Sequence, residues 1–309
     1  GSFVLAVPIF CMLIEFIGIR VKEEDPVMAE KYDRLAKDLM KVSLTAYSWT
    51  AILGGILLFT FITLFPGFFK YMAGIFRPVM HVYALMFLAE SGVLYVYYYG
   101  WDKMKDDTFL KWIHCSLSVL LNLIGTVLMY LANSWATFMQ APGGIDSEGR
   151  FLGNIWHVIH STLWNPVGVH RILGNIVFGG GIVGAYAAYH YLTAKNEEER
   201  AHYDWVCYVA MFICIFGLIP LPFAGYWLMK EVYAFRQQMG ITLMGGIMAW
   251  LFIIQAVMIG LLFFAANSYL HNGMARVKGS HRYMKYCKYM VLLLICCFTM
   301  WMTPHTIVM

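Results

Sequence analysis

Long apolar segments, separated by short polar ones, dominate the chain. Runs of roughly twenty mostly apolar residues have the length that a helix needs to cross a bilayer. Such runs cover residues 3–19, 42–66, 74–99, 112–135, 167–193, 204–227, 238–268 and 287–303. The pattern predicts an all-α, polytopic membrane helix bundle with about eight transmembrane helices, a single transmembrane domain over residues 1–309. The polar stretch 20–41 is expected to form an exposed amphipathic helix between two spans.

Composition agrees with this pattern. Hydrophobic residues make up 61% of the 309 residues, and charged residues only 13%. This balance excludes a water-soluble globular protein.

The Lys and Arg residues predict the orientation in the membrane. Sixteen of the 22 fall in four alternate segments, 20–41, 100–111, 194–203 and 269–288. Because basic loops face the cytoplasm, these segments are expected inside, and the N-terminus and the loop 136–166 outside. The net charge of +4 reflects this inner basic excess and needs no nucleic-acid partner.

A histidine followed by glycines opens one apolar segment. Gly174, Gly181 and Gly184 follow His170 at steps of four, eleven and fourteen, so they lie on one stripe of a helix. Imidazole is a common ligand of haem iron, and a flat macrocycle approaches a helix closely where side chains are missing. The alternative is that the glycines only let another transmembrane helix pack closely.

Several other chemistries lack their motifs. The sequence has no Cys-x-x-Cys-His run, which excludes covalent attachment of c-type haem. It also has no phosphate-binding glycine loop, zinc spacing or nucleophile elbow, so hydrolytic and nucleotide chemistry have little support.

Five motifs in order carry a resemblance to a known family. They are Ile14-Glu15-Phe16 followed by Arg20 and Asp25-Pro26; Phe87-Leu88-Ala89-Glu90-Ser91 with Gly100-Trp101-Asp102; Ala132-Asn133-Ser134-Trp135 with Met139-Gln140 and Pro142; Asn165-Pro166 before His170; and Phe235-Arg236-Gln237-Gln238-Met239. Together they resemble subunit I of cytochrome bd quinol oxidase.

The resemblance implies a low-spin haem b with His170 as an iron ligand. Met239 is the nearest match for the methionine that binds the iron on the other face of the haem, and Arg236 would pair with a haem propionate. Gly174, one turn after His170, would leave room for the macrocycle. The Arg-x-x-Met spacing is one residue longer than in the family, which rotates the thioether by ~100° and leaves the sixth ligand open. Arg236 has a second interpretation, as a basic residue at the membrane interface.

Departures from the family concern quinol and oxygen. Where the family has a long hydrophilic quinol loop, this chain has only Gly225 to Gln238. The histidine expected on the first helix falls either upstream of Gly1 or at Phe3, and an expected acidic residue is Val82. The oxygen-reduction site is therefore expected to be dismantled or rebuilt.

Other polar residues have two interpretations each. His81 and His305, both expected at outer helix ends, could ligate a second haem b or be hydrogen-bonded interfacial histidines. Glu90 lies in apolar surroundings, where a function is the default hypothesis. The resemblance implies that it serves a proton route, and the alternative is a neutral acid within the bundle. Glu15 lies in a similar setting, but a functional role is not the preferred interpretation there.

The preferred hypothesis is a haem b subunit that exchanges electrons between quinol and an outer-face redox partner. That partner would be another subunit of a respiratory complex, such as a multihaem cytochrome c, and the chain would be the quinol-oxidising oxidoreductase subunit. The resemblance places it among membrane lipid in a bacterial or archaeal cytoplasmic membrane. The alternatives are a bd-type terminal quinol oxidase that reduces dioxygen and a haem-free anchor of a redox complex.

Overall fold

The structure is a computed structural model that describes residues 2–246 and 249–273. In these residues the regular structure is helical, apart from one isolated bridge between Ile145 and Phe151. Seven of the described helical segments are long and apolar enough to cross a membrane. The expected all-α, polytopic membrane protein is confirmed, and the eighth predicted span, 287–303, lies outside the described residues.

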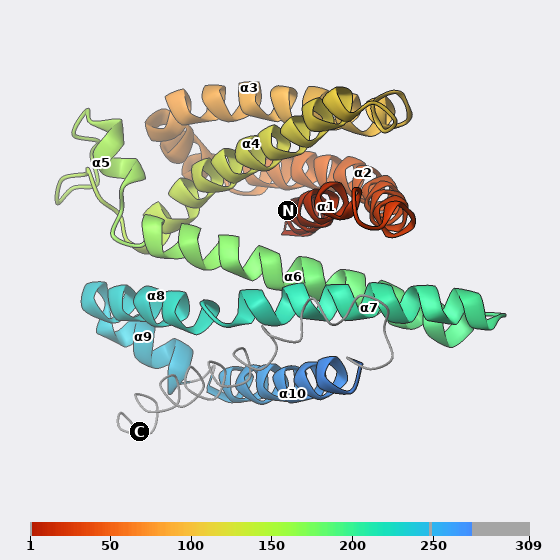
Figure 1. Cartoon of the computed structure of the whole chain (residues 1–309). Helices are drawn as coiled ribbons and strands as arrows, with labels where there is room; N and C mark the ends of the chain where they lie inside the picture. Colours follow the sequence, from red (N-terminus) through yellow and green to blue (C-terminus); the bar gives the residue numbers. More distant parts are fainter. Residues whose placement is uncertain (1, 247–248, 274–309) are drawn as a thin grey trace. The chain divides into compact units, whose positions relative to one another are not determined.

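The chain divides into two compact units, residues 1–164 and 165–309, and each is described by itself. The first unit holds four long helices and one short one (Figure 1). These are α1 (Ser2–Val21), α2 (Pro26–Leu64), α3 (Pro66–Met104), α4 (Thr108–Gln140) and α5 (Ile155–Ile159). The single domain over the whole chain stays a prediction.

Short polar turns set the ends of these helices. The Asp25 side chain accepts a hydrogen bond from the backbone N–H of Met28 at 3.1 Å, and Pro26 occupies the first turn of α2. Asp107 caps α4 in the same way, through the N–H of Leu110 at 2.9 Å. Such caps satisfy backbone donors that a helix start leaves unpaired.

Helix α2 is longer than the apolar pattern predicts. The expected amphipathic helix 20–41 and the expected span 42–66 join in α2, which has 39 residues, because nothing breaks the helix between Pro26 and the Phe65-Pro66 step. A helix of that length extends ~58 Å, whereas the hydrocarbon core is ~30 Å thick. Part of α2 therefore lies beyond the apolar layer. In its second half, large apolar side chains such as Leu53, Leu57 and Phe59 are exposed, as expected of a surface that faces lipid.

The loop 141–163 is ordered and packs on its own unit. Val158 and Ile159 of α5 join Phe76 and Phe138 in one buried cluster. The helical part of this loop is confined to the five residues of α5, because the chain before it turns at glycines with positive φ, including Gly153.

The second unit contains the remaining helices. They are α6 (Trp164–Thr193), α7 (Glu197–Leu218), α8 (Leu221–Phe235), α9 (Gln237–Met244) and α10 (Ala249–Gly273). The predicted span 204–227 is interrupted at Ile219–Pro220 between α7 and α8, since proline lacks the N–H that would continue the helix. The predicted span 238–268 likewise falls on α9 and α10.

Glycine brings α6 close to α7. A Cβ added at Gly180 would lie 2.8 Å from the carbonyl oxygen of Ala210 and 2.8 Å from the backbone nitrogen of Cys214.

We expect Gly180→Ala to lower the free energy of unfolding by about 1–3 kcal/mol, because neither backbone atom can move away without disturbing α7. SDS-induced unfolding of the purified protein measures this difference. The matched control is Gly181→Ala, because a Cβ there meets no atom within 4 Å; equal losses in the two variants would contradict the close packing.

Candidate functional site

The candidate haem ligand His170 lies in the first third of α6. Its Nδ1 is buried and has no hydrogen-bond partner among the described residues. Gly225 of α8 lies beside the ring, since an added Cβ there would lie 3.5 Å from Cε1 and 3.7 Å from Nδ1. A buried polar atom without a partner is costly unless a ligand or water satisfies it. His170 therefore has the chemistry and the surroundings of a residue that binds a group.

The glycine stripe of α6 is open along one part and tightly packed at another. Cβ atoms added at Gly174 and Gly181 would meet nothing within 4 Å. A Cβ at Gly184, by contrast, would collide with the Met211 side chain of α7. The stripe is open one turn after His170, as a flat ligand requires, and serves helix packing farther along.

The expected partners of this site follow α8. Arg236 is exposed between α8 and α9, and the half-buried Met239 donates its N–H to the Arg236 carbonyl oxygen at 3.0 Å. Their approach to His170 stays a prediction.

The residues proposed for a second haem are not brought together in the described part of the chain. His81 is an exposed residue of α3, in the other unit, and His305 lies outside the described residues.

Glu90 of α3 is buried, with 7% of its surface exposed. Its Oε1 would lie 3.0 Å from a Cβ built on Gly125 of α4, and the Leu5 side chain is close to the same position. The missing side chain at Gly125 thus makes room for the carboxyl group. Its role in a proton route stays a prediction.

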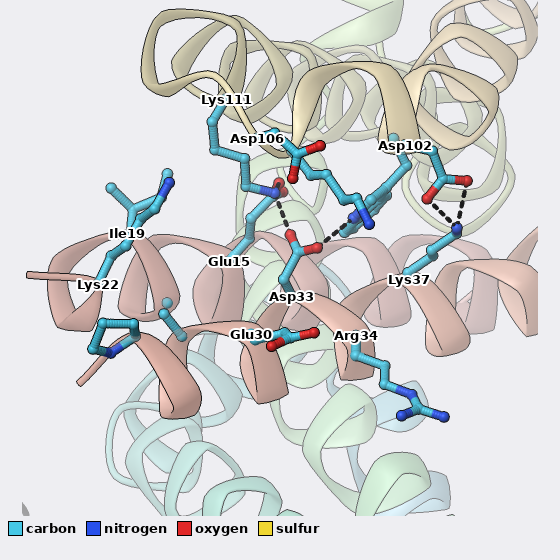
Figure 2. A pocket seen from close by; sticks show the side chains of 15 residues that line it. Glu15, Ile19, Lys22, Glu30, Asp33, Arg34, Lys37, Asp102, Asp106 and Lys111 are labelled. Carbon is cyan, nitrogen blue, oxygen red and sulfur yellow. Dashed lines mark hydrogen bonds and ion pairs between the residues drawn. The ribbon is translucent and has the colours of Figure 1, made fainter.

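A second buried acid, Glu15, has the more elaborate surroundings. Its carboxylate accepts hydrogen bonds from the Tyr97 hydroxyl at 2.7 Å and from Lys111 Nζ at 2.6 Å, and it lies 2.5 Å from His114 Nδ1. Lys111 also pairs with Asp33. Figure 2 shows Glu15, Asp33 and Lys111 pointing toward one another. These residues, which we call the Glu15 cluster (Glu15, Asp33, Tyr97, Lys111 and His114), come from α1, α2, α3 and α4.

Aromatic rings close the cluster on one side. The Trp101 indole N–H donates to Asp33 at 2.9 Å, its ring lies 5.0 Å from Lys111 Nζ, and the centroid of the His114 ring lies 4.4 Å away. Such contacts hold the charged groups in fixed positions.

A cavity of about 510 Å³ adjoins the cluster. Five carboxylates and five cations line it: Glu15, Glu30, Asp33, Asp102 and Asp106, and Lys22, Arg34, Lys37, Lys105 and Lys111. At the more exposed end, Lys37 binds both carboxylate oxygens of Asp102, at 2.6 and 2.7 Å. Apart from Glu15, Gly18 and Ile19, the lining residues belong to the segments 20–41 and 100–111, which the distribution of basic residues predicts to face inward.

Sequence reasoning missed most of this cluster. A signal was present, since Lys111 and His114 are three residues apart and share a helix face. Their partners were not readable, because Glu15 is 96 and 99 residues away from them in the sequence. In the described part of the chain, no group of three or more His, Cys, Asp or Glu residues could hold a metal ion.

Comparisons with known proteins agree with the helical architecture. One solved structure, "The structure of bd oxidase from Geobacillus thermodenitrificans", matches with a TM-score of 0.67 and 15% sequence identity. The match covers 76% of this chain and 52% of the other, so this chain spans about half the length of that protein. At this identity the match shows the fold alone. No curated protein matches the sequence.

A family comparison is more specific. The model of the family described as "Cytochrome bd terminal oxidase subunit I" matches residues 2–249, which is most of the chain. This range includes His170, Met239 and all five motifs. The chain therefore belongs to the cytochrome bd terminal oxidase subunit I family.

Proposed function

We propose that this chain is a haem b electron-transfer subunit that exchanges electrons between membrane quinol and a redox partner on the outer face. The observation that carries the proposal is the buried Nδ1 of His170 without a partner, beside Gly225 and one turn before the open Gly174. Family membership supports a membrane electron-transfer role of the quinol-oxidase type.

The residues around His170 fit a haem. His170 would ligate the iron, and Gly174 and Gly225 would leave room for the macrocycle. Arg236, exposed after α8, would pair with a propionate, and Met239 is the candidate for the second ligand. When bound, haem b supplies one-electron redox chemistry, and the protein contributes ligands, orientation and a low dielectric.

The quinol would contact the surface of α8. Three aromatic side chains of this helix, Phe223, Tyr226 and Trp227, are exposed by 38–57%, so the flat aromatic ring of a quinol could stack on them. Between α8 and α10 the described chain contains the eight-residue α9 in place of a long hydrophilic loop. Since the sequence has no c-type attachment motif, an acceptor such as a multihaem cytochrome c would be a separate subunit.

The choice of electron acceptor tests this function. We expect the purified protein to oxidise quinol when a soluble acceptor such as ferricyanide is supplied, and to consume oxygen at least about tenfold more slowly, because the family's oxygen-site residues are replaced in this chain, as at Val82. Stopped-flow absorbance of quinol and an oxygen electrode measure the two rates. Rapid, cyanide-sensitive oxygen consumption without any partner would favour the terminal-oxidase alternative. A protein that retains no haem would favour the anchor.

A further inference from the structure

The polar contacts of the two ring nitrogens of His114 show how many protons the ring and Glu15 must hold between them. Nε2 lies 3.0 Å from the backbone carbonyl oxygen of Tyr97, and Nδ1 lies 2.5 Å from Glu15 Oε1. A carbonyl oxygen can only accept, so the single N–H of a neutral imidazole must be on Nε2. The contact between Nδ1 and Oε1 then needs a second proton, because two lone pairs would otherwise face each other.

Charge balance leads to the same proton. The Glu15 cluster contains two carboxylates, Glu15 and Asp33, and the cation Lys111. One additional proton on the Glu15–His114 pair makes the cluster neutral. Without this proton it would carry one net negative charge among side chains that are 0–23% exposed, and an uncompensated buried charge is costly.

Other groups around the pair favour the form in which His114 is the cation. Glu15 already accepts from Lys111 and from the Tyr97 hydroxyl, and hydrogen bonds to a carboxylate stabilise its charged form. The charged and titratable groups that face the pair are Cys11 from α1, Asp33 from α2, Tyr97 from α3, and Lys111 and Cys115 from α4. Among these side chains Lys111 is the only cation, so it cannot neutralise both carboxylates.

The cavity supplies a way in for water. Glu15 and Lys111 line it, whereas the side chain of His114 is completely buried behind them. A proton can therefore reach the pair from the aqueous side through the Glu15 carboxylate and pass to Nδ1 across the 2.5 Å contact.

We propose that Glu15 and His114 form a proton-binding site, which takes one proton from water in the adjoining cavity and holds it between His114 Nδ1 and Glu15 Oε1. The site is separate from His170, from Glu90 and from the electron-transfer role proposed above. When loaded, the site adds a second hydrogen bond between α1 and α4 to the one that Lys111 donates to Glu15.

Nitrogen NMR of the histidine rings tests the site directly. In full-length protein labelled with ¹⁵N-histidine and placed in liposomes at pH 8, ordinary exposed histidines are neutral, because their pKa is about 6.5. We expect one ring with both nitrogens protonated. This signal should disappear in His114→Gln and remain in His190→Gln, which removes a histidine of the other unit. A wild-type spectrum without a doubly protonated ring would overturn the proposal, as would a signal that survives His114→Gln.

Two further variants keep the test decisive if His114→Gln does not fold. Glu15→Gln should convert the ring to its neutral form, because the cluster is then balanced without the proton. Tyr97→Phe removes only the hydroxyl donor and leaves the carbonyl that faces Nε2, so the doubly protonated ring should persist. A ring that stays doubly protonated in Glu15→Gln would contradict the shared proton. A ring nitrogen that keeps its hydrogen after a day in D2O would contradict exchange through the cavity. Neither readout depends on electron transfer.

Discussion

His170→Ala is expected to yield a protein that inserts into the membrane but has lost its low-spin haem b and its quinol-oxidising electron transfer. Insertion follows the hydropathy of α6, which one alanine does not reduce, whereas retention of the haem depends on its iron ligand. Reduced-minus-oxidised spectra of the purified variant measure the haem, and quinol oxidation with ferricyanide should fall at least about a hundredfold.

The matched control is His190→Ala in the same helix. His190 is twenty residues farther along α6, about 30 Å away, and stacks on Tyr203 of α7 at 4.7 Å. Its replacement should leave the low-spin spectrum unchanged. If the His170→Ala variant keeps that spectrum, or if both variants lose it equally, His170 is not the ligand.

The existence of the helices could be predicted from the sequence, but several of their ends could not. The apolar pattern predicts where a helix crosses the bilayer, and each of the seven predicted spans in the described region overlaps one of the observed helices or a pair of them. The pattern predicts a separate amphipathic helix over 20–41 and does not predict that it joins the span 42–66 in one helix, as it does in α2. It also gives little weight to a single proline inside an apolar run, although Pro220 separates α7 from α8.

The candidate site residues also divide into those that a local sequence pattern identifies and those that it does not. His170 could be selected because a histidine before spaced glycines is a local pattern, and its surroundings agree with a ligand-binding role. The Glu15 cluster is formed by four helices, so its composition depends on tertiary packing that no local pattern contains. An acid such as Glu15 within an apolar segment can be recognised in the sequence, whereas the lysine and histidine that pair with it cannot be assigned to it.

Of the residues in the Glu15 cluster, Lys111 should contribute most to the stability of the protein. Lys111 binds Glu15 Oε1 at 2.6 Å and also pairs with Asp33, and its own side chain is 9% exposed. Lys111→Met would leave two neighbouring carboxylates with one less cation, inside the first unit. We expect a loss of about 3–5 kcal/mol in the free energy of unfolding, the usual cost of breaking a buried ion pair. SDS-induced unfolding followed by circular dichroism measures it.

Lys37→Met provides the comparison within the same cavity. It removes the pair with Asp102, whose side chain is 66% exposed against 34% for Lys37, so the loss should be much smaller than in Lys111→Met. The double variant Lys111→Met/Asp33→Asn should recover part of the stability, because removal of one carboxylate restores neutrality if the Glu15–His114 pair holds its proton. Equal losses in Lys111→Met and Lys37→Met would show that the cluster is solvated and contributes no more than a surface pair. Failure of the double variant to recover any stability would instead indicate that the geometry of the Lys111 hydrogen bonds, rather than the net charge, holds the four helices together.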